Sequence, residues 1–112
     1  MFLIAAFLSL VTPSDRWVHV GSTSLHEEYV DTGSIRRSGD KVTLWTRRDF
    51  KLDQGNSWSE LEFNCSKRTE AILSYIRDDR GTISHNVVRP HRAASPVPPG
   101  SVEERIFNIA CR

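Results

Sequence analysis

The sequence has only two cysteines and one methionine among its 112 residues, and it lacks the short motifs that mark most catalytic and metal sites. There is no Cys-x-x-Cys pair, no His-Glu-x-x-His helix motif and no Gly-x-Ser-x-Gly nucleophile turn. No glycine-rich loop is present that could cradle a phosphate. We therefore expect no cofactor and no bound metal, and the sequence favours a non-enzymatic protein.

An excess of charge of either sign is also missing. Fifteen Lys and Arg residues nearly cancel fourteen Asp and Glu residues, which leaves a formal net charge of +1. A protein with this balance has no overall field to attract nucleic acid or an anionic membrane surface. We expect no nucleic-acid partner.

Long apolar runs are absent except at the N-terminus, where residues 1–11 read MFLIAAFLSLV. About 20 apolar residues are needed to span a bilayer, so this run predicts no stable membrane span. Its length matches the apolar region of a secretory signal, although no basic residue precedes it and no Ala-x-Ala site follows. We predict a signal-like segment at 1–14 that is removed on export, and one domain at 15–112. The alternative is a buried N-terminal element.

Cys65 and Cys111 are the only cysteines. In a reducing cytosol they would be two unrelated buried thiols. In an exported chain an even count indicates disulfide bonding, and two cysteines allow one pairing. Because the segment at 1–14 favours export to the periplasm or the medium, we predict a Cys65–Cys111 disulfide.

Short strand-like runs separated by turn residues predict an α+β fold. We expect an antiparallel meander sheet of about five to six strands, with one C-terminal helix packed on it and one disulfide. A helical reading of residues 68–78 stays open, although their β-branched and aromatic content favours a strand. The expected strands are 17–20, 26–31, 41–51, 58–65, 68–78 and 82–88.

The run 58–65 alternates most clearly between its two sides. Leu61 and Phe63 share one face, and Glu60 and Glu62 share the other. A strand with one buried face needs this alternation. By the same alternation, Trp45 and Trp58 point away from the core face.

The C-terminal residues carry the signature of a helix. Ser101 is a favourable N-cap, and Glu104 three residues later completes a capping box. Val102, Ile106 and Ala110 follow at helical spacing and form an apolar stripe that Phe107 widens. We expect this stripe to face the sheet. Residues 89–100 hold four of the five prolines and predict an extended connector before the helix.

An ordered series of short motifs runs through the chain from about residue 16 to residue 112. The series is Trp17-Val18-His19-Val20-Gly21, Tyr29-Val30-Asp31, Ser34-Ile35, Gly39-Asp40, Val42, Trp45, Asp49-Phe50, Glu62-Phe63-Asn64-Cys65, Arg68, Gly81, Pro98-Pro99-Gly100-Ser101 and Cys111. It resembles the surface-adhesin protein E-like domains of Gram-negative bacteria. The resemblance implies an extended antiparallel sheet, a helix joined to it by a disulfide, in some members a homodimer, and adhesion to host matrix or serum proteins. No cysteine lies next to the signal-like segment, which favours a periplasmic or secreted protein over a lipid-anchored one.

Three functional hypotheses follow from these observations. The first is an envelope interaction module that binds a protein or polysaccharide partner through the outer sheet face around Arg36, Trp45, Arg47 and Trp58. Paired in space, the dipeptides 36–37 and 47–48 would form a basic patch, although an ordinary charged sheet face is the simpler expectation. The second is a small metal-dependent enzyme that uses His26, Glu28 and His85. The third is a structural homodimer of the cell envelope.

Overall fold

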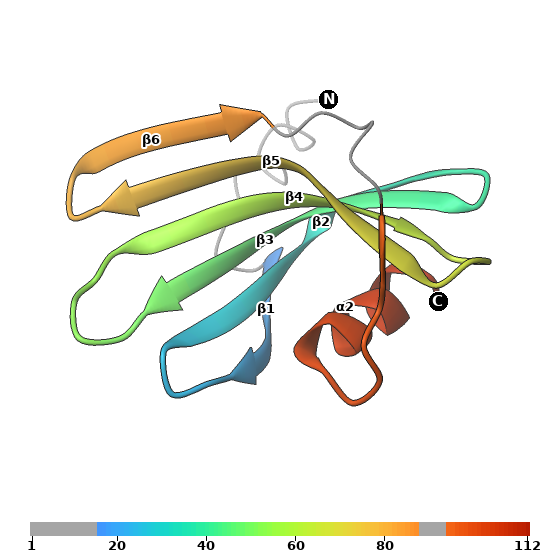
Figure 1. Ribbon diagram of the computed structural model, residues 1–112, viewed down its shortest axis with the longest axis horizontal. Coiled ribbons are helices and arrows are strands. Elements are labelled where there is room, and N and C mark those ends of the chain that lie inside the picture. Colours follow the sequence, from blue (N-terminus) through green and yellow to red (C-terminus); the bar gives the residue numbers. More distant parts are fainter. Residues whose placement is uncertain (1–15, 88–93) are drawn as a thin grey trace, which may run out of the picture.

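The computed structural model describes residues 16–87 and 94–112 (Figure 1). Its sheet follows the meander order β1-β2-β3-β4-β5-β6, with each neighbouring pair antiparallel. The predicted α+β architecture is confirmed, whereas the signal-like segment at 1–14 lies outside the described residues. The strands are β1 Trp17–Ser22, β2 His26–Ser38, β3 Lys41–Phe50, β4 Asn56–Asn64, β5 Thr69–Asp79, β6 Thr82–Val87 and β7 Ser95–Pro96.

Two features of the sheet differ from the sequence expectations. Strand β2 does not end at Asp31 but continues to Ser38 through a bulge. At the bulge the Ser34 hydroxyl accepts the Trp45 N–H at 2.8 Å and donates to the Asp31 carbonyl at 2.7 Å, so a side chain replaces part of the backbone ladder. Residues 95–96, which belong to the predicted connector, also form the short strand β7. This strand pairs with the first residues of β5, whereas β6 pairs with the later residues of β5.

The helix α2 spans Val102–Ala110 and lies on one side of the sheet (Figure 1). The Ser101 hydroxyl accepts the Glu104 N–H at 3.1 Å, as the capping box predicts. The Glu104 carboxylate accepts from the Gly100 N–H at 3.0 Å, one residue before the expected donor. Close approach to the sheet is possible because β1 has a glycine here: a Cβ on Gly21 would lie 2.7 Å from the Val102 side chain.

The apolar core of the described residues lies between α2 and the sheet. Phe107 is at its centre, and its ring meets that of Phe63 edge-on, with 5.8 Å between the ring centroids. From the turn before β5, the Arg68 guanidinium covers the Phe107 ring at 4.5 Å and pairs with Glu104 at 3.1 Å. The buried apolar residues are Val20, Val30, Val42, Leu44, Leu61, Phe63, Val97, Ile106, Phe107 and Ala110.

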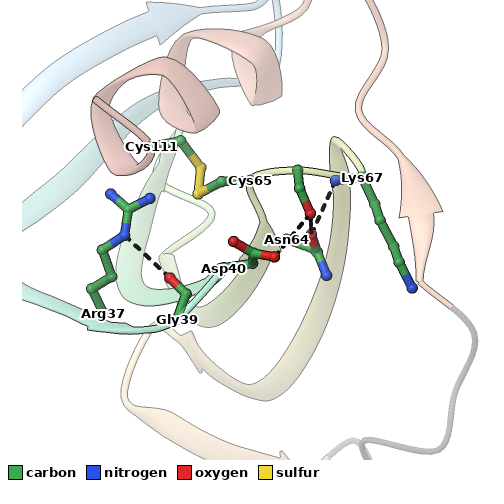
Figure 2. Close-up of a disulfide and its surroundings, with 8 residues drawn as sticks. Arg37, Gly39, Asp40, Asn64, Cys65, Lys67 and Cys111 are labelled. Atoms are coloured by element: carbon green, nitrogen blue, oxygen red, sulfur yellow. Dashed lines mark hydrogen bonds between the residues drawn. A yellow bond between two sulfur atoms is a disulfide. The ribbon is translucent and has the colours of Figure 1, made fainter.

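The disulfide closes this core at the C-terminal end of α2. Figure 2 shows Cys111, which caps the helix, bonded to Cys65, which directly follows β4. Their Cα atoms are 5.6 Å apart, within the range of an ordinary bridge. The Cys65 N–H donates to the Asp40 carbonyl at 2.7 Å, so the bridge joins the helix to a backbone already held by the β2–β3 turn. The predicted Cys65–Cys111 pairing is confirmed.

Candidate functional site

The sheet has two unlike faces. The inner face packs against α2, while the outer face, opposite to it, has no layer of the described residues over it. Sheet register brings Trp17, Asp31, Trp45 and Glu60 into one row across β1, β2, β3 and β4 on the outer face. Tyr29, Arg47, Trp58, Ile76 and His85 belong to the neighbouring row.

An open cleft lies on the outer face between these two rows. Its volume is about 410 Å³, within the usual size range of ligand sites. Almost all of its lining is apolar, and the three tryptophans in its wall are the only tryptophans of the protein. We call it the tryptophan cleft and define it by Trp17, Asp31, Trp45, Trp58 and Ile76.

Asp31 is the acidic residue of the cleft, and it is buried. Its carboxylate binds the Arg16 guanidinium through two hydrogen bonds, Nε to Oδ1 at 3.0 Å and Nη2 to Oδ2 at 2.9 Å. The Gly33 N–H also donates to Oδ1 at 2.9 Å. A Cβ on Gly33 would come within 2.4 Å of the Arg16 Nε, so a side chain here would displace the guanidinium from its present place. Asp31 therefore lies between Trp17 and Trp45 with its negative charge compensated by the Arg16 guanidinium.

Arg47 is fixed at the rim of the cleft. Its guanidinium carbon lies 4.9 Å from the Trp17 ring and 4.5 Å from the Tyr29 ring. The same guanidinium binds the Asp49 carboxylate at 2.9 and 3.2 Å. Stacking and ion pairing together hold the arginine flat against the sheet and leave its charge compensated.

The arginines 36, 37, 47 and 48 do not form a single basic patch. Arg36 lies on the outer face, where it is exposed and donates to the Gly33 and Ile35 carbonyls. Arg37 and Arg48 alternate to the inner side, with Arg48 Nε 3.3 Å from the buried Glu28 carboxylate. Strand alternation therefore separates each Arg-Arg dipeptide between the two faces, as an ordinary charged sheet requires.

The second hypothesis required His26, Glu28 and His85 to meet. His26 and Glu28 do so on β2, with Nε2 and Oε1 3.3 Å apart, but His85 is exposed on β6. Four strand spacings separate β2 from β6, roughly 19 Å at the usual interstrand distance. Within 16–87 and 94–112, no group of three or more metal-binding side chains is assembled.

A smaller pocket of about 140 Å³ lies on the inner face beside the start of α2, and its charged lining residues are Glu28, Arg48, Glu70 and Glu103. Burial, followed by the charges of Glu103 and Glu28, raises the pKa of Glu70 to about 7, against a smaller opposing effect of Arg48. Among the described atoms, Glu70 Oε2 is buried without a hydrogen-bond partner. The pocket therefore disfavours an ionised Glu70.

The raised pKa of Glu70 predicts a pH dependence of stability. Because the folded protein holds this proton more tightly than the unfolded chain, the favourable contribution is complete below pH 4.5 and disappears as the pH rises past about 7. Glu70→Gln should therefore raise the unfolding free energy at pH 8 by about 1–2 kcal/mol, after allowance for solvent screening, and change little at pH 4. Urea unfolding at both pH values checks this. The exposed control Asp79→Asn should show no such pH-dependent gain, and an equal gain at pH 4 would contradict the explanation.

Another carboxylate at the edge of the outer face behaves in the opposite way. Hydrogen bonds from Ser22 and His19, with a smaller contribution from Lys51, lower the pKa of Glu27 to about 2. His19 Nε2 lies 2.7 Å from Glu27 Oε1, and the His19 ring meets that of Tyr29 edge-on. The Glu27 carboxylate is therefore ionised near neutral pH and is already hydrogen-bonded by its neighbours. It is not poised to exchange a proton at that pH.

A comparison with known protein families shows to which family this chain belongs. The model of the family described as surface-adhesin protein E matches residues 17–112. The chain belongs to the surface-adhesin protein E family. No curated protein and no solved structure matches it significantly. Family membership indicates a surface adhesin-like role and an exported or surface-located protein, and no helix among the described residues is long and apolar enough to cross a membrane.

Of the five residues that line the tryptophan cleft of this adhesin-family domain, two could be expected from the sequence and three could not. Trp45 and Trp58 lie on the outer face as the alternation predicts, and Arg47 lies beside them. Trp17, Asp31 and Ile76 were not anticipated as site residues, because their place in the cleft depends on the registers of β1, β2 and β5 with their neighbours. The available signal was that the remaining tryptophan, Trp17, also falls in an expected strand, residues 17–20.

Proposed function

We propose that this domain is an exported, non-enzymatic binding module of the adhesin type, and that its partner sits on the tryptophan cleft. The observation that carries the proposal is the convergence of all three tryptophans on one open cleft of the outer face. None of the three tryptophans belongs to the core, which lies on the inner face. Tryptophans left half-buried on a surface are frequent anchors of binding interfaces.

The arrangement of the cleft suits binding rather than chemistry. Its apolar walls offer area to be removed from water, and its charged groups, Asp31 and Arg47, are held by partners within the domain. A contiguous apolar patch rimmed by polar groups is typical of interaction sites on soluble proteins. A fixed rim orients a partner without a side-chain ordering cost at the moment of binding.

Export is supported by three independent features. The domain carries a disulfide, which persists in oxidising compartments. Its family is one of surface adhesins. The apolar run at 1–11 has the length of a signal core. Together they favour a periplasmic or secreted location for the domain at 15–112.

Trp45→Ala and Trp58→Ala should each weaken adhesion by roughly tenfold or more, the effect expected for truncating an aromatic anchor. Beads that carry the domain through its C-terminus can be tested on surfaces coated with basement-membrane extract and on albumin. Leu52→Ala is the control, because the Leu52 side chain is highly exposed and lies in the loop between β3 and β4, outside the cleft lining. Circular dichroism and light scattering verify that fold and oligomeric state are unchanged. Adhesion by folded Trp45→Ala and Trp58→Ala variants that equals the wild-type level would contradict the proposal.

A further inference from the structure

We propose that the tryptophan cleft takes an uncharged oligosaccharide chain, with sugar rings stacked on its indoles. This inference rests on the binding function proposed above and specifies the chemistry of the partner. It follows from three properties of the cleft, which are the chemistry of its walls, the charge balance of its rim and its extent across the strands.

The walls suit rings that are apolar on their faces and polar on their edges. A pyranose ring presents C–H groups on its flat faces and hydroxyls around its perimeter. Trp17, Trp45 and Trp58 offer half-buried aromatic surface with a single indole N–H donor each. The faces of aromatic rings carry a partial negative charge and attract the weakly positive hydrogen atoms of C–H groups. An indole can therefore cover a sugar face while the sugar hydroxyls stay at the rim.

The arginines that contact the cleft residues offer no free positive charge, and Arg36, which is exposed on the same face, lies outside the cleft lining. The guanidiniums of Arg16 and Arg47 are each bound bidentately by Asp31 and Asp49. An anionic polysaccharide would have to displace those carboxylates or approach them, which carries an electrostatic cost. Hydroxyl groups, which both donate and accept, can share the remaining lone pairs of these carboxylates. A neutral polyhydroxyl ligand therefore matches the rim better than an anionic one.

The Glu60 carboxylate strengthens the same conclusion. It lies in the row of Trp45 and accepts the Ser74 hydroxyl at 3.2 Å. Both of these side chains belong to central strands, so they are fixed by the sheet on either side. Glu60 adds an acceptor for sugar hydroxyls and adds repulsion toward an anion.

The cleft is longer than a single sugar ring. Its tryptophans come from β1, β3 and β4, three strand spacings that amount to roughly 14 Å. The ligand therefore lies across the strands, and more than one linked ring contacts indole. A polypeptide that joined the sheet by backbone pairing would instead align with an edge strand. The direction of the cleft favours a polysaccharide over a paired protein strand.

The experiment titrates the ¹⁵N-labelled domain with cellohexaose, maltohexaose and chitohexaose at millimolar concentrations. All three indole N–H signals of the protein come from the cleft, so every change in them reports on this site. At least one hexasaccharide should shift the indole signals saturably. Trp45→Ala should weaken that binding about tenfold, equivalent to about 1.4 kcal/mol, while Trp45→Phe keeps most of it and Leu52→Ala keeps all of it.

Two outcomes overturn the inference. One is that none of the three neutral hexasaccharides shifts the indoles, and the other is that a sulfated hexasaccharide or a proline-rich decapeptide binds in their place. The adhesion assay on basement-membrane extract distinguishes a wrong saccharide assignment from a wrong assignment of the binding site. Loss of Trp45-dependent adhesion after periodate treatment of the extract supports the saccharide. Adhesion that survives periodate but not protease contradicts the saccharide and keeps the binding site.

Discussion

Replacing both Cys65 and Cys111 with alanine is expected to lower the free energy of unfolding by roughly 4 kcal/mol, the chain-entropy value for a loop closed over 46 positions. The loss is large because a small domain has only about 5–15 kcal/mol of net stability. It should also concentrate at the helix, since Cys111 is the cap of α2 and the bridge is the covalent bond that joins α2 to β4. Hydrogen exchange of the α2 amides should therefore accelerate more than exchange in β3.

Urea unfolding of the oxidised, the reduced and the double-alanine protein measures this effect. Reduction should destabilise the wild type by about as much as the double substitution does. The double-alanine protein should be insensitive to reductant, which provides the matched control. If reduction leaves the unfolding midpoint unchanged, the bridge contributes nothing to the fold and this part of the account fails.

Phe63→Ala is expected to cost about 3–5 kcal/mol, the usual penalty for removing a fully buried aromatic ring. Phe63 has no exposed surface, and its ring is the sheet's contact with Phe107 of the helix. Among the described residues, α2 is the layer that covers this part of the inner face, so the cavity would lie between the helix and the sheet. The substitution therefore removes sheet packing and helix docking together.

Phe50→Ala is the matched control for that substitution. Phe50 is half-buried at the far end of β3, where the Arg77 guanidinium covers its ring at 4.1 Å. Its loss should cost about 1–2 kcal/mol. Thermal and urea unfolding of both variants, compared at equal temperature, check the difference. Equal destabilisation by Phe63→Ala and Phe50→Ala would show that the core is not centred under α2.

The fold could be predicted largely from local patterns. The alternation of Leu61 and Phe63 against Glu60 and Glu62 placed β4 correctly, and the Ser101–Glu104 pair located the start of α2. The strand at 69–79 was ambiguous from sequence, and its pairing with both β4 and β6 decides it. What local patterns missed depended on tertiary contacts. Ser34 carries β2 through its bulge, and residues 95–96 become a strand only because β5 is there to pair with them.

The candidate site was predictable in part for the same reason. Alternation within β3 and β4 was enough to place Trp45 and Trp58 on the outer face. Trp17 and Asp31 join them through the registers of β1 with β2 and β2 with β3, which no short window of sequence contains. The ion pair of Asp31 with Arg16 depends further on Gly33, whose missing side chain makes room for the guanidinium.

One-sided packing connects stability with the proposed function. The helix, the disulfide and the apolar core all belong to the inner face, so the tryptophans of the outer face lie outside the core. These aromatic residues are thereby available for binding. Substitutions in the tryptophan cleft should be tolerated structurally, whereas substitutions such as Phe63→Ala should not.

Hydroxyl-radical footprinting is the most direct test of the outer face as the binding surface. The domain is oxidised free in solution and while bound to beads coated with basement-membrane extract, and modified residues are located by mass spectrometry. Oxidation of Trp45 and Trp58 should fall sharply on binding, while that of Tyr75, which lines the inner-face pocket, stays the same. Unchanged oxidation of Trp45 and Trp58 in the bound domain, or protection of Tyr75 in their place, would contradict the assignment.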